Sequence, residues 1–128
     1  MKSIMTSVSP YLCGKIASGK CKILVRKFAP KEVPFKAYIY CAKISDKKHR
    51  SDKFNIGIWK GNEHVIGEFI CDKVDEYKYD YGCGYYPGDG VDIDDDTILE
   101  TAIDREDINI YAKGKTLYGW YISDLRIY

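Results

Sequence analysis

The fold of this chain is decided by a helix-to-strand junction that reads SGKCKILVRK over residues 18–27. Ser9 followed by Pro10 predicts the start of the preceding helix, because serine caps helix N-termini and proline is tolerated at the first helical position. Gly19 suits the residue just beyond a helix end, where the backbone is often left-handed. The predicted strand that follows, Cys21–Phe28, is apolar at its centre and basic at both ends. We therefore expect a short helix that turns directly into a basic strand.

Outward from this junction, strand patterns occupy most of the chain. Lys2–Val8 and Phe35–Lys43 are rich in β-branched and aromatic residues, and Thr116–Tyr128 alternates apolar with polar positions. The run His64–Tyr77 contains a further long strand, and Asp104 is placed to cap a short helix. Roughly five or six strands with two short helices indicate an α+β domain, and we expect a curved or barrel-closed sheet.

Two segments lack the pattern of a helix or a strand. Residues 45–53 contain no apolar side chain and predict an exposed basic loop. Residues 79–96 are dominated by glycine, tyrosine and aspartate, which predicts a long surface loop. Between these segments, Phe54–Trp59 is expected to form a short strand.

Length and composition bound the class of protein. With 128 residues, 45% of them hydrophobic and 30% charged, the chain is expected to form one globular domain over 1–128. No apolar run approaches the roughly 18 residues of a transmembrane helix, and residues 1–7 lack the long apolar stretch and cleavage site of a secretory signal, so we expect a cytoplasmic protein with no membrane contact. Five cysteines without C-x-x-C spacing argue against a disulfide framework and a zinc site. We expect no metal and no cofactor, and Cys41 and Cys71 are expected in the core.

Charge is divided unevenly along the sequence. Residues 1–60 hold 14 Lys/Arg and 3 Asp/Glu, a net of +11, whereas residues 61–128 hold 6 Lys/Arg and 16 Asp/Glu, a net of −10. A basic face attracts anions, nucleic acid above all, if the two halves stay apart in space. If the halves interleave in one sheet, the charges only solvate its surface. The sequence leaves both interpretations open.

The junction strand supplies four basic candidates for phosphate binding, Lys20, Lys22, Arg26 and Lys27. Arg26 is the best single candidate, because a planar guanidinium can bind phosphate through two parallel hydrogen bonds. The alternative is that the four side chains form a solvated basic edge with no ligand.

Glu68 and Tyr121 are the candidates for contacting a base. A carboxylate accepts hydrogen bonds from exocyclic amines, and an exposed strand tyrosine can stack on an unpaired base. Trp59 is a second stacking candidate, whereas Trp120 alternates with Ile122 and is expected in the core. The alternative for Glu68 is an exposed position or an ion pair with a nearby lysine.

Three separated blocks of the sequence resemble the ASCH domain family, in the family's order. Residues 18–27 are similar to the signature G-x-K-x-x-E-x-R. VIGEFICDKV at 65–74 and LYGWYISDLRIY at 117–128 resemble the second strand block and the closing strand of short ASCH proteins from phages and low-GC Gram-positive bacteria. The resemblance implies a PUA-like β-barrel with a cleft that faces RNA or a modified nucleoside.

The same resemblance implies that catalytic groups are missing. Some family members are similar to amidohydrolases that deacetylate cytidine derivatives, using a lysine and a threonine after the motif glycine together with a glutamate. Gly19 and Arg26 match the motif, but the lysine and threonine positions hold Cys21 and Lys22, and the motif glutamate position holds Leu24. We therefore expect no catalytic residue.

The sequence is interpreted as an RNA- or nucleotide-binding module with a degenerate catalytic motif. One alternative is a nucleoside amidohydrolase or nuclease with an altered residue set, in which Cys21 is the nucleophile. Strand geometry opposes this alternative, because Lys20 and Lys22 flank Cys21 and adjacent strand residues point to opposite faces. A second alternative is a phage-encoded anti-defence factor with a protein partner, whose acidic half imitates nucleic acid.

Overall fold

The computed structural model describes residues 1–42, 63–80 and 90–128. Over these ranges the chain forms nine strands and three helices. In chain order they are β1 (Lys2–Val8), α1 (Pro10–Ala17), β2 (Ile23–Arg26), β3 (Phe35–Cys41), β4 (Val65–Cys71), β5 (Val74–Tyr77), β6 (Tyr79–Asp80), β7 (Gly90–Val91), α2 (Asp95–Thr101), α3 (Arg105–Ala112), β8 (Leu117–Tyr121) and β9 (Ser123–Ile127). The predicted basic loop at 45–53, the predicted strand at 54–59 and Trp59 lie outside the described residues.

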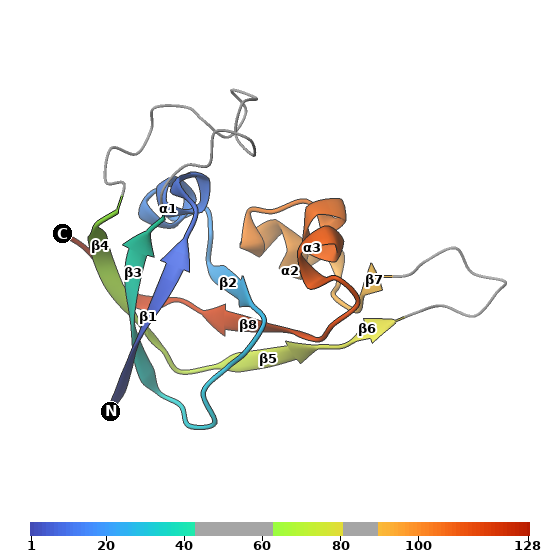
Figure 1. The fold of residues 1–128 in the computed structure, drawn as a ribbon, viewed down its shortest axis with the longest axis horizontal. Helices are drawn as coiled ribbons and strands as arrows, with labels where there is room; N and C mark the ends of the chain where they lie inside the picture. Colours follow the sequence, from blue (N-terminus) through green and yellow to red (C-terminus); the bar gives the residue numbers. More distant parts are fainter. Residues whose placement is uncertain (43–62, 81–89) are drawn as a thin grey trace, which may run out of the picture.

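The described strands form two main sheets and a two-stranded ribbon. The larger sheet has the order β1-β3-β4-β9, in which β1 and β3 are parallel and the other pairs are antiparallel. The smaller sheet has the antiparallel order β2-β8-β5, and β6 pairs with β7. Chain continuity links the two sheets, because β4 runs on into β5 and β8 runs on into β9 (Figure 1).

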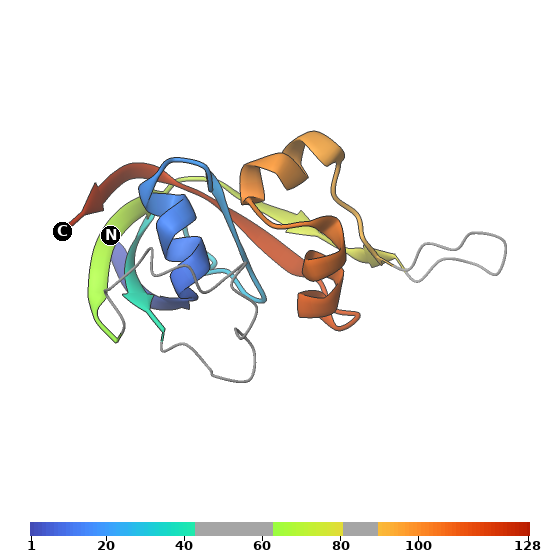
Figure 2. The same ribbon diagram turned by 90° about the horizontal axis from the view of Figure 1, so that it is seen from above.

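The main core lies between the larger sheet and α1, which packs on the concave side of that sheet (Figure 2). Trp120 is fully buried at its centre, and its indole N–H donates to the Phe28 carbonyl at 3.1 Å. The rings of Phe28 and Phe35 meet the Trp120 ring edge-on, with centroids 5.5 and 5.1 Å away. Edge-to-face packing of this kind stabilises a core beyond the area that it buries.

A second core lies where α3 and the chain that leads into α2 pack on the smaller sheet. Its buried members are Val25, Tyr77, Val91, Ile93, Ile108, Ala112 and Leu117. The predicted helix after Asp104 is confirmed as α3, whereas α2 was not predicted. The cap of α2 is Asp94, whose carboxylate accepts from the Thr97 N–H at 2.7 Å. The sequence did not reveal Asp94 as a helix cap, because Asp94 belongs to a run of aspartates that is typical of a loop.

The predicted α+β class is confirmed, and several details of the prediction are wrong. The run His64–Tyr77 does contain a long strand, β4, which is followed after Asp72-Lys73 by the short β5, whereas the strand predicted over Thr116–Tyr128 is divided at Ile122. Each break is where the chain passes from one sheet to the other. The strands and helices outnumber the five or six and the two that were expected. A closed barrel is not seen in the part of the chain that the structure describes.

Cysteine burial agrees with the prediction for Cys41 and Cys71, since the four described cysteines are free and buried. No group of three or more His, Cys, Asp or Glu side chains that could hold a metal occurs among the described residues. Within the same ranges, no helix combines the length and the apolar character needed to cross a membrane.

Candidate ligand-binding cleft

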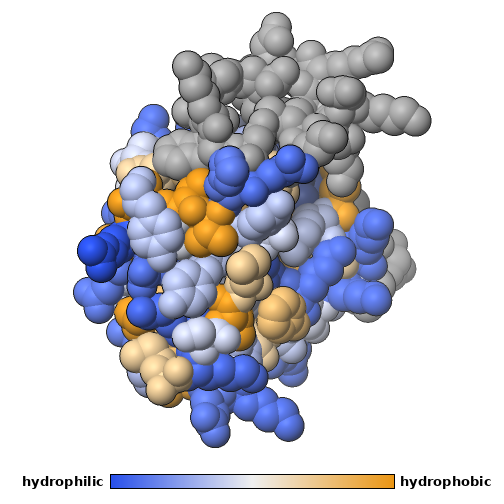
Figure 3. Space-filling model, turned by 60° about the vertical axis from the view of Figure 1, so that its left-hand side comes forward, coloured by the Kyte–Doolittle hydropathy of each residue, from blue (hydrophilic) through white to orange (hydrophobic). Residues whose placement is uncertain are grey.

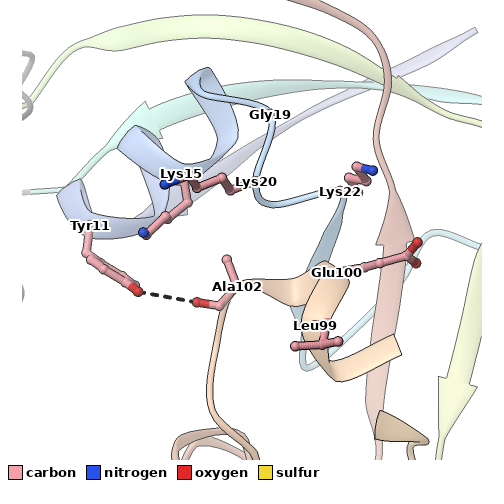
Figure 4. Close-up of a pocket in the computed structure, with 8 residues that line it drawn as sticks. All are labelled: Tyr11, Lys15, Gly19, Lys20, Lys22, Leu99, Glu100 and Ala102. Atoms are coloured by element: carbon pink, nitrogen blue, oxygen red, sulfur yellow. Dashed lines mark hydrogen bonds between the residues drawn. The ribbon is translucent and has the colours of Figure 1, made fainter. Parts of the chain in front are cut away.

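A cleft of about 520 Å³ lies between α1 and α2, above the segment that joins α1 to β2 (Figure 4). This volume falls within the roughly 300–1,000 Å³ that small-molecule sites occupy. We call this site the lysine cleft. Its lining residues are Tyr11, Lys15, Gly19, Lys20, Lys22, Leu99, Glu100 and Ala102.

The tight turn after α1 positions two of the lysines. Gly19 has a φ of +78°, which glycine adopts without strain. The N–H groups of Lys20 and Cys21 then both donate to the Lys15 carbonyl, at 2.9 and 3.0 Å, so the chain reverses at the helix end. Cys21 is buried between two exposed residues, Lys20 and Lys22. Burial of the cysteine therefore leaves both lysine side chains at the surface.

Two hydrogen bonds fix the α2 wall against the rest of the cleft. The Lys22 N–H donates to the Glu100 carbonyl at 2.7 Å, beside the start of β2. The Tyr11 hydroxyl donates to the Ala102 carbonyl at 3.4 Å, where α2 ends in a left-handed residue. Figure 4 shows this second contact bridging α1 and α2. The walls are thus joined both at the β2 side and at the Tyr11 side.

The electrostatic character of the lysine cleft is basic. Its lining carries three lysines and one glutamate, a formal net charge of +2. No carboxylate of the described residues lies within salt-bridge distance of Lys15, Lys20 or Lys22. The Lys15 ammonium lies 5.3 Å from the centre of the Tyr11 ring, a cation–π contact that attracts the ammonium without neutralising its formal charge.

The four basic residues predicted around the junction do not gather in one place. Lys20 and Lys22 line the cleft, whereas Arg26 and Lys27 do not. The Arg26 guanidinium donates to the Ser7 carbonyl of β1 at 3.1 Å. The Lys27 ammonium lies 4.8 Å from the centre of the Tyr111 ring. Only half of the basic run therefore faces the opening between α1 and α2.

Glu68 lies on the outer, convex side of the larger sheet, away from the cleft. Its carboxylate forms an ion pair with Lys36 at 2.9 Å and accepts from the Tyr128 hydroxyl at 2.8 Å. These two hydrogen bonds hold the pKa of Glu68 below its usual range, and they raise the pKa values of Lys36 and Tyr128. The lysine-partner alternative therefore describes Glu68 in this structure, and Glu100 is the carboxylate that lines the cleft.

The side of the sheet that carries Glu68 is called here the outer sheet face (Figure 3). Strand register places its side chains in rows, with Met5 opposite Tyr38, Tyr38 opposite Glu68 and Glu68 opposite Arg126. Figure 3 shows apolar, weakly polar and strongly hydrophilic side chains mixed over this surface.

Tyr121 lies next to the lysine cleft but does not line it. It pairs in the ladder with Ile23, the residue after Lys22. Its hydroxyl donates to the Asp75 carboxylate at 2.7 Å, and this bond is the main cause that raises the pKa of Tyr121 to about 12. The Lys73 ammonium lies 4.5 Å from the centre of its ring. Stacking of a base on Tyr121 remains a prediction, and Lys73 already occupies part of the ring surface.

Cys21 has the structural role that the sequence favoured. Its thiol is buried and donates to the Ile23 carbonyl at 3.3 Å. Burial raises the pKa of Cys21 to about 11, so the reactive thiolate is scarce at neutral pH. The alternative of a Cys21 nucleophile therefore has neither exposure nor activation to support it.

Five lining residues were missed by sequence reasoning: Tyr11, Lys15, Leu99, Glu100 and Ala102. Tyr11 and Lys15 are four residues apart on α1, and this spacing places side chains on one helix face. That signal was present in the sequence. Glu100 could not be found, because the helix that carries it was not predicted.

No protein-family model matches this sequence, and no curated protein matches it. Among solved structures, the chain is similar to the crystal structure of ASCH from Zymomonas mobilis, with 16% sequence identity and a TM-score of 0.60 over 98% of this chain and 70% of that chain. A tyrosine-to-phenylalanine mutant of the Zymomonas mobilis protein matches with 16% identity and a TM-score of 0.59, over 99% of this chain and 73% of that chain. These matches show the fold, and they agree with the resemblance of the three sequence blocks.

Proposed function

Because the chain folds as an ASCH-like domain, we propose that it is a PUA-like module that binds RNA or a nucleotide in the lysine cleft. One observation carries the proposal: Lys15, Lys20 and Lys22 come from a helix and the turn after it, and all three line one cleft without a carboxylate partner in the described structure. Paired lysines are already neutralised, whereas unpaired ones exchange their counterions for phosphate.

The remaining lining suits the other parts of a nucleotide. Leu99 offers an exposed apolar side chain on the α2 wall, and Tyr11 offers on the α1 wall an aromatic ring whose centre the Lys15 ammonium approaches to 5.3 Å. Aromatic and apolar surfaces hold unstacked bases in single-stranded RNA recognition. The Glu100 carboxylate adds an acceptor for exocyclic amines, which is the role first considered for Glu68.

The chemistry of the lining favours binding over hydrolysis. The lining holds lysines and a glutamate, which can transfer protons, but no serine, threonine, cysteine or histidine, so the hydroxyl nucleophile that the family's amidohydrolases pair with their lysine is missing from it. We infer that ligand retention, and not turnover, is what the cleft provides.

Fluorescence anisotropy with a labelled single-stranded RNA decamer tests this function. We expect micromolar binding at low salt, with log affinity falling against log salt by about 0.7 per phosphate contact. Lys20→Gln combined with Lys22→Gln is expected to weaken binding and to flatten the salt slope by about 1.4. The matched control, Lys2→Gln with Lys31→Gln, removes two exposed lysines of the basic half that do not line the cleft.

The proposal is wrong if no RNA and no mononucleotide binds at micromolar protein in low salt. It is also wrong if the control pair weakens binding as much as the cleft pair. That second result would assign the affinity to the basic half as a whole.

A further inference from the structure

We propose that the lysine cleft binds a terminal phosphate monoester, at the end of an RNA chain or on a free mononucleotide, in preference to an internal phosphodiester. This inference rests on the proposed function and narrows its ligand. It follows from the shape of the cleft, from its charge and from the charges around it.

The shape of the cleft favours a ligand that ends inside it. Contacts join its two walls at both sides, from Tyr11 to Ala102 and from Lys22 to Glu100. A continuous strand that passed between α1 and α2 would have to break one of these contacts. A chain end or a single nucleotide can enter from the open surface and leave both intact, and a cleft of about 520 Å³ has the size for such a ligand.

The charge of the lining matches a monoester better than a diester. Lys15, Lys20 and Lys22 against Glu100 leave a formal charge of +2. A phosphate monoester carries about −1.5 to −2 at neutral pH and offers three acceptor oxygens, whereas an internal diester carries about −1. A monoester can therefore neutralise the lining in one binding event.

The surroundings of the cleft oppose a longer polyanion. The first turns of α2 and α3 carry acidic side chains, Asp95 and Asp96 in α2 and Glu106 and Asp107 in α3. Asp95 is offset by an ion pair with Arg105, but the other three carboxylates have no such partner in the described structure. A strand that continued over α2 would place its next phosphates near like charges, and like charges are unfavourable at close range. The favourable part of the surface is thus local to the three lysines.

The test compares RNA decamers of one sequence that carry a central fluorophore and differ only at their ends: 5′-phosphate, 3′-phosphate or hydroxyl at both ends. A monophosphate on one end is expected to raise affinity about fivefold over the hydroxyl-ended RNA, because the monoester brings up to about one more negative charge to the ammonium groups than the internal phosphodiester that would otherwise bind there. Competition with cytidine monophosphate against cytidine reports the free mononucleotide. The decamer arms and the competition arm distinguish the two sources of the monoester.

Lys20→Gln is expected to reduce the end-phosphate preference to less than about twofold, and Lys2→Gln to keep it near fivefold. Thermal unfolding of both variants verifies that they remain folded. Equal affinity for the three decamers, together with no competition by cytidine monophosphate, overturns this inference but leaves the proposed function standing. Absence of binding by every decamer and by the mononucleotide overturns both.

Discussion

The lysine cleft and the outer sheet face contain the same side-chain types and use them in opposite ways. On the outer sheet face, Lys36, Glu68 and Tyr128 bond to one another at 2.9 and 2.8 Å. In the cleft, Lys20 and Lys22 have no carboxylate partner among the described residues. A paired charge is satisfied within the fold, whereas an unpaired one remains available to an anion. Availability of a charge, and not its presence in the sequence, therefore separates a binding surface from a structural one.

Charge reversal in the cleft should give the largest change in RNA affinity of the substitutions considered. Lys20→Glu with Lys22→Glu replaces two attractions for phosphate by two repulsions, and we expect RNA affinity to fall about 100-fold at moderate salt. Anisotropy titrations measure this change. Lys36→Gln on the outer sheet face is the control and should leave the affinity within about twofold. A large loss in the control would show that both surfaces contact RNA.

Gly67→Ala should affect the outer sheet without affecting the cleft. A Cβ at Gly67 would lie 2.6 Å from the Arg126 carbonyl oxygen and 2.9 Å from the Ile127 side chain, so the pairing of β4 with β9 must shift. We expect the free energy of unfolding to fall by about 1–3 kcal/mol, measured by urea denaturation. The RNA affinity of the folded variant should not change. An equal loss of affinity would mean that the outer sheet shapes the cleft.

Variants at Tyr121 test whether the binding surface extends beyond the residues that line the cleft. Tyr121→Phe keeps the ring and loses the hydrogen bond to Asp75, which should lower the free energy of unfolding by about 1 kcal/mol. Comparison with Tyr121→Ala in the RNA titration then tests the stacking prediction. Weaker binding by Tyr121→Ala alone would extend the binding surface beyond the cleft to this ring.

Glu68→Gln should give the smallest effect, and a pH-dependent one. Hydrogen bonds from Lys36 and Tyr128 lower the folded-state pKa of Glu68 below its unfolded value. The stabilisation is therefore present above the unfolded value of about 4.3 and is lost as pH falls through the folded value. We expect a small deficit in the melting temperature of Glu68→Gln at pH 7 that disappears by about pH 3. If the melting temperature of Glu68→Gln stays below that of the unsubstituted protein at acid pH, the cause is packing and not ionisation of Glu68.

The helix-to-strand junction could be predicted because its signals are local. Ser9, Pro10 and Gly19 each act on the backbone within a few residues, and α1 begins and ends where they indicate. The strands Lys2–Val8 and Phe35–Cys41 followed from their own composition. The core positions of Cys41 and Cys71 likewise followed from the apolar runs that contain them.

The location of each charged side chain in space could not be predicted in the same way. Lys20 and Arg26 belong to one basic run, yet one lines the cleft and the other bonds to Ser7 in β1. Their difference depends on the approach of a strand 19 positions away in the sequence. Likewise, Glu68 lies opposite Arg126 because of sheet register, and nothing in its neighbouring residues specifies that partner.

The direct continuation of β4 into β5 and of β8 into β9 couples the local unfolding of the two sheets. Both antiparallel pairs belong to one long hairpin, so the backbone bonds of the two sheets share the same two chain segments. Neither sheet can then detach as an independent foldon, because freeing one bends or frees the strands of the other. Slow amide hydrogen exchange in Phe69 of β4 and Trp120 of β8 should accordingly occur with one common opening energy.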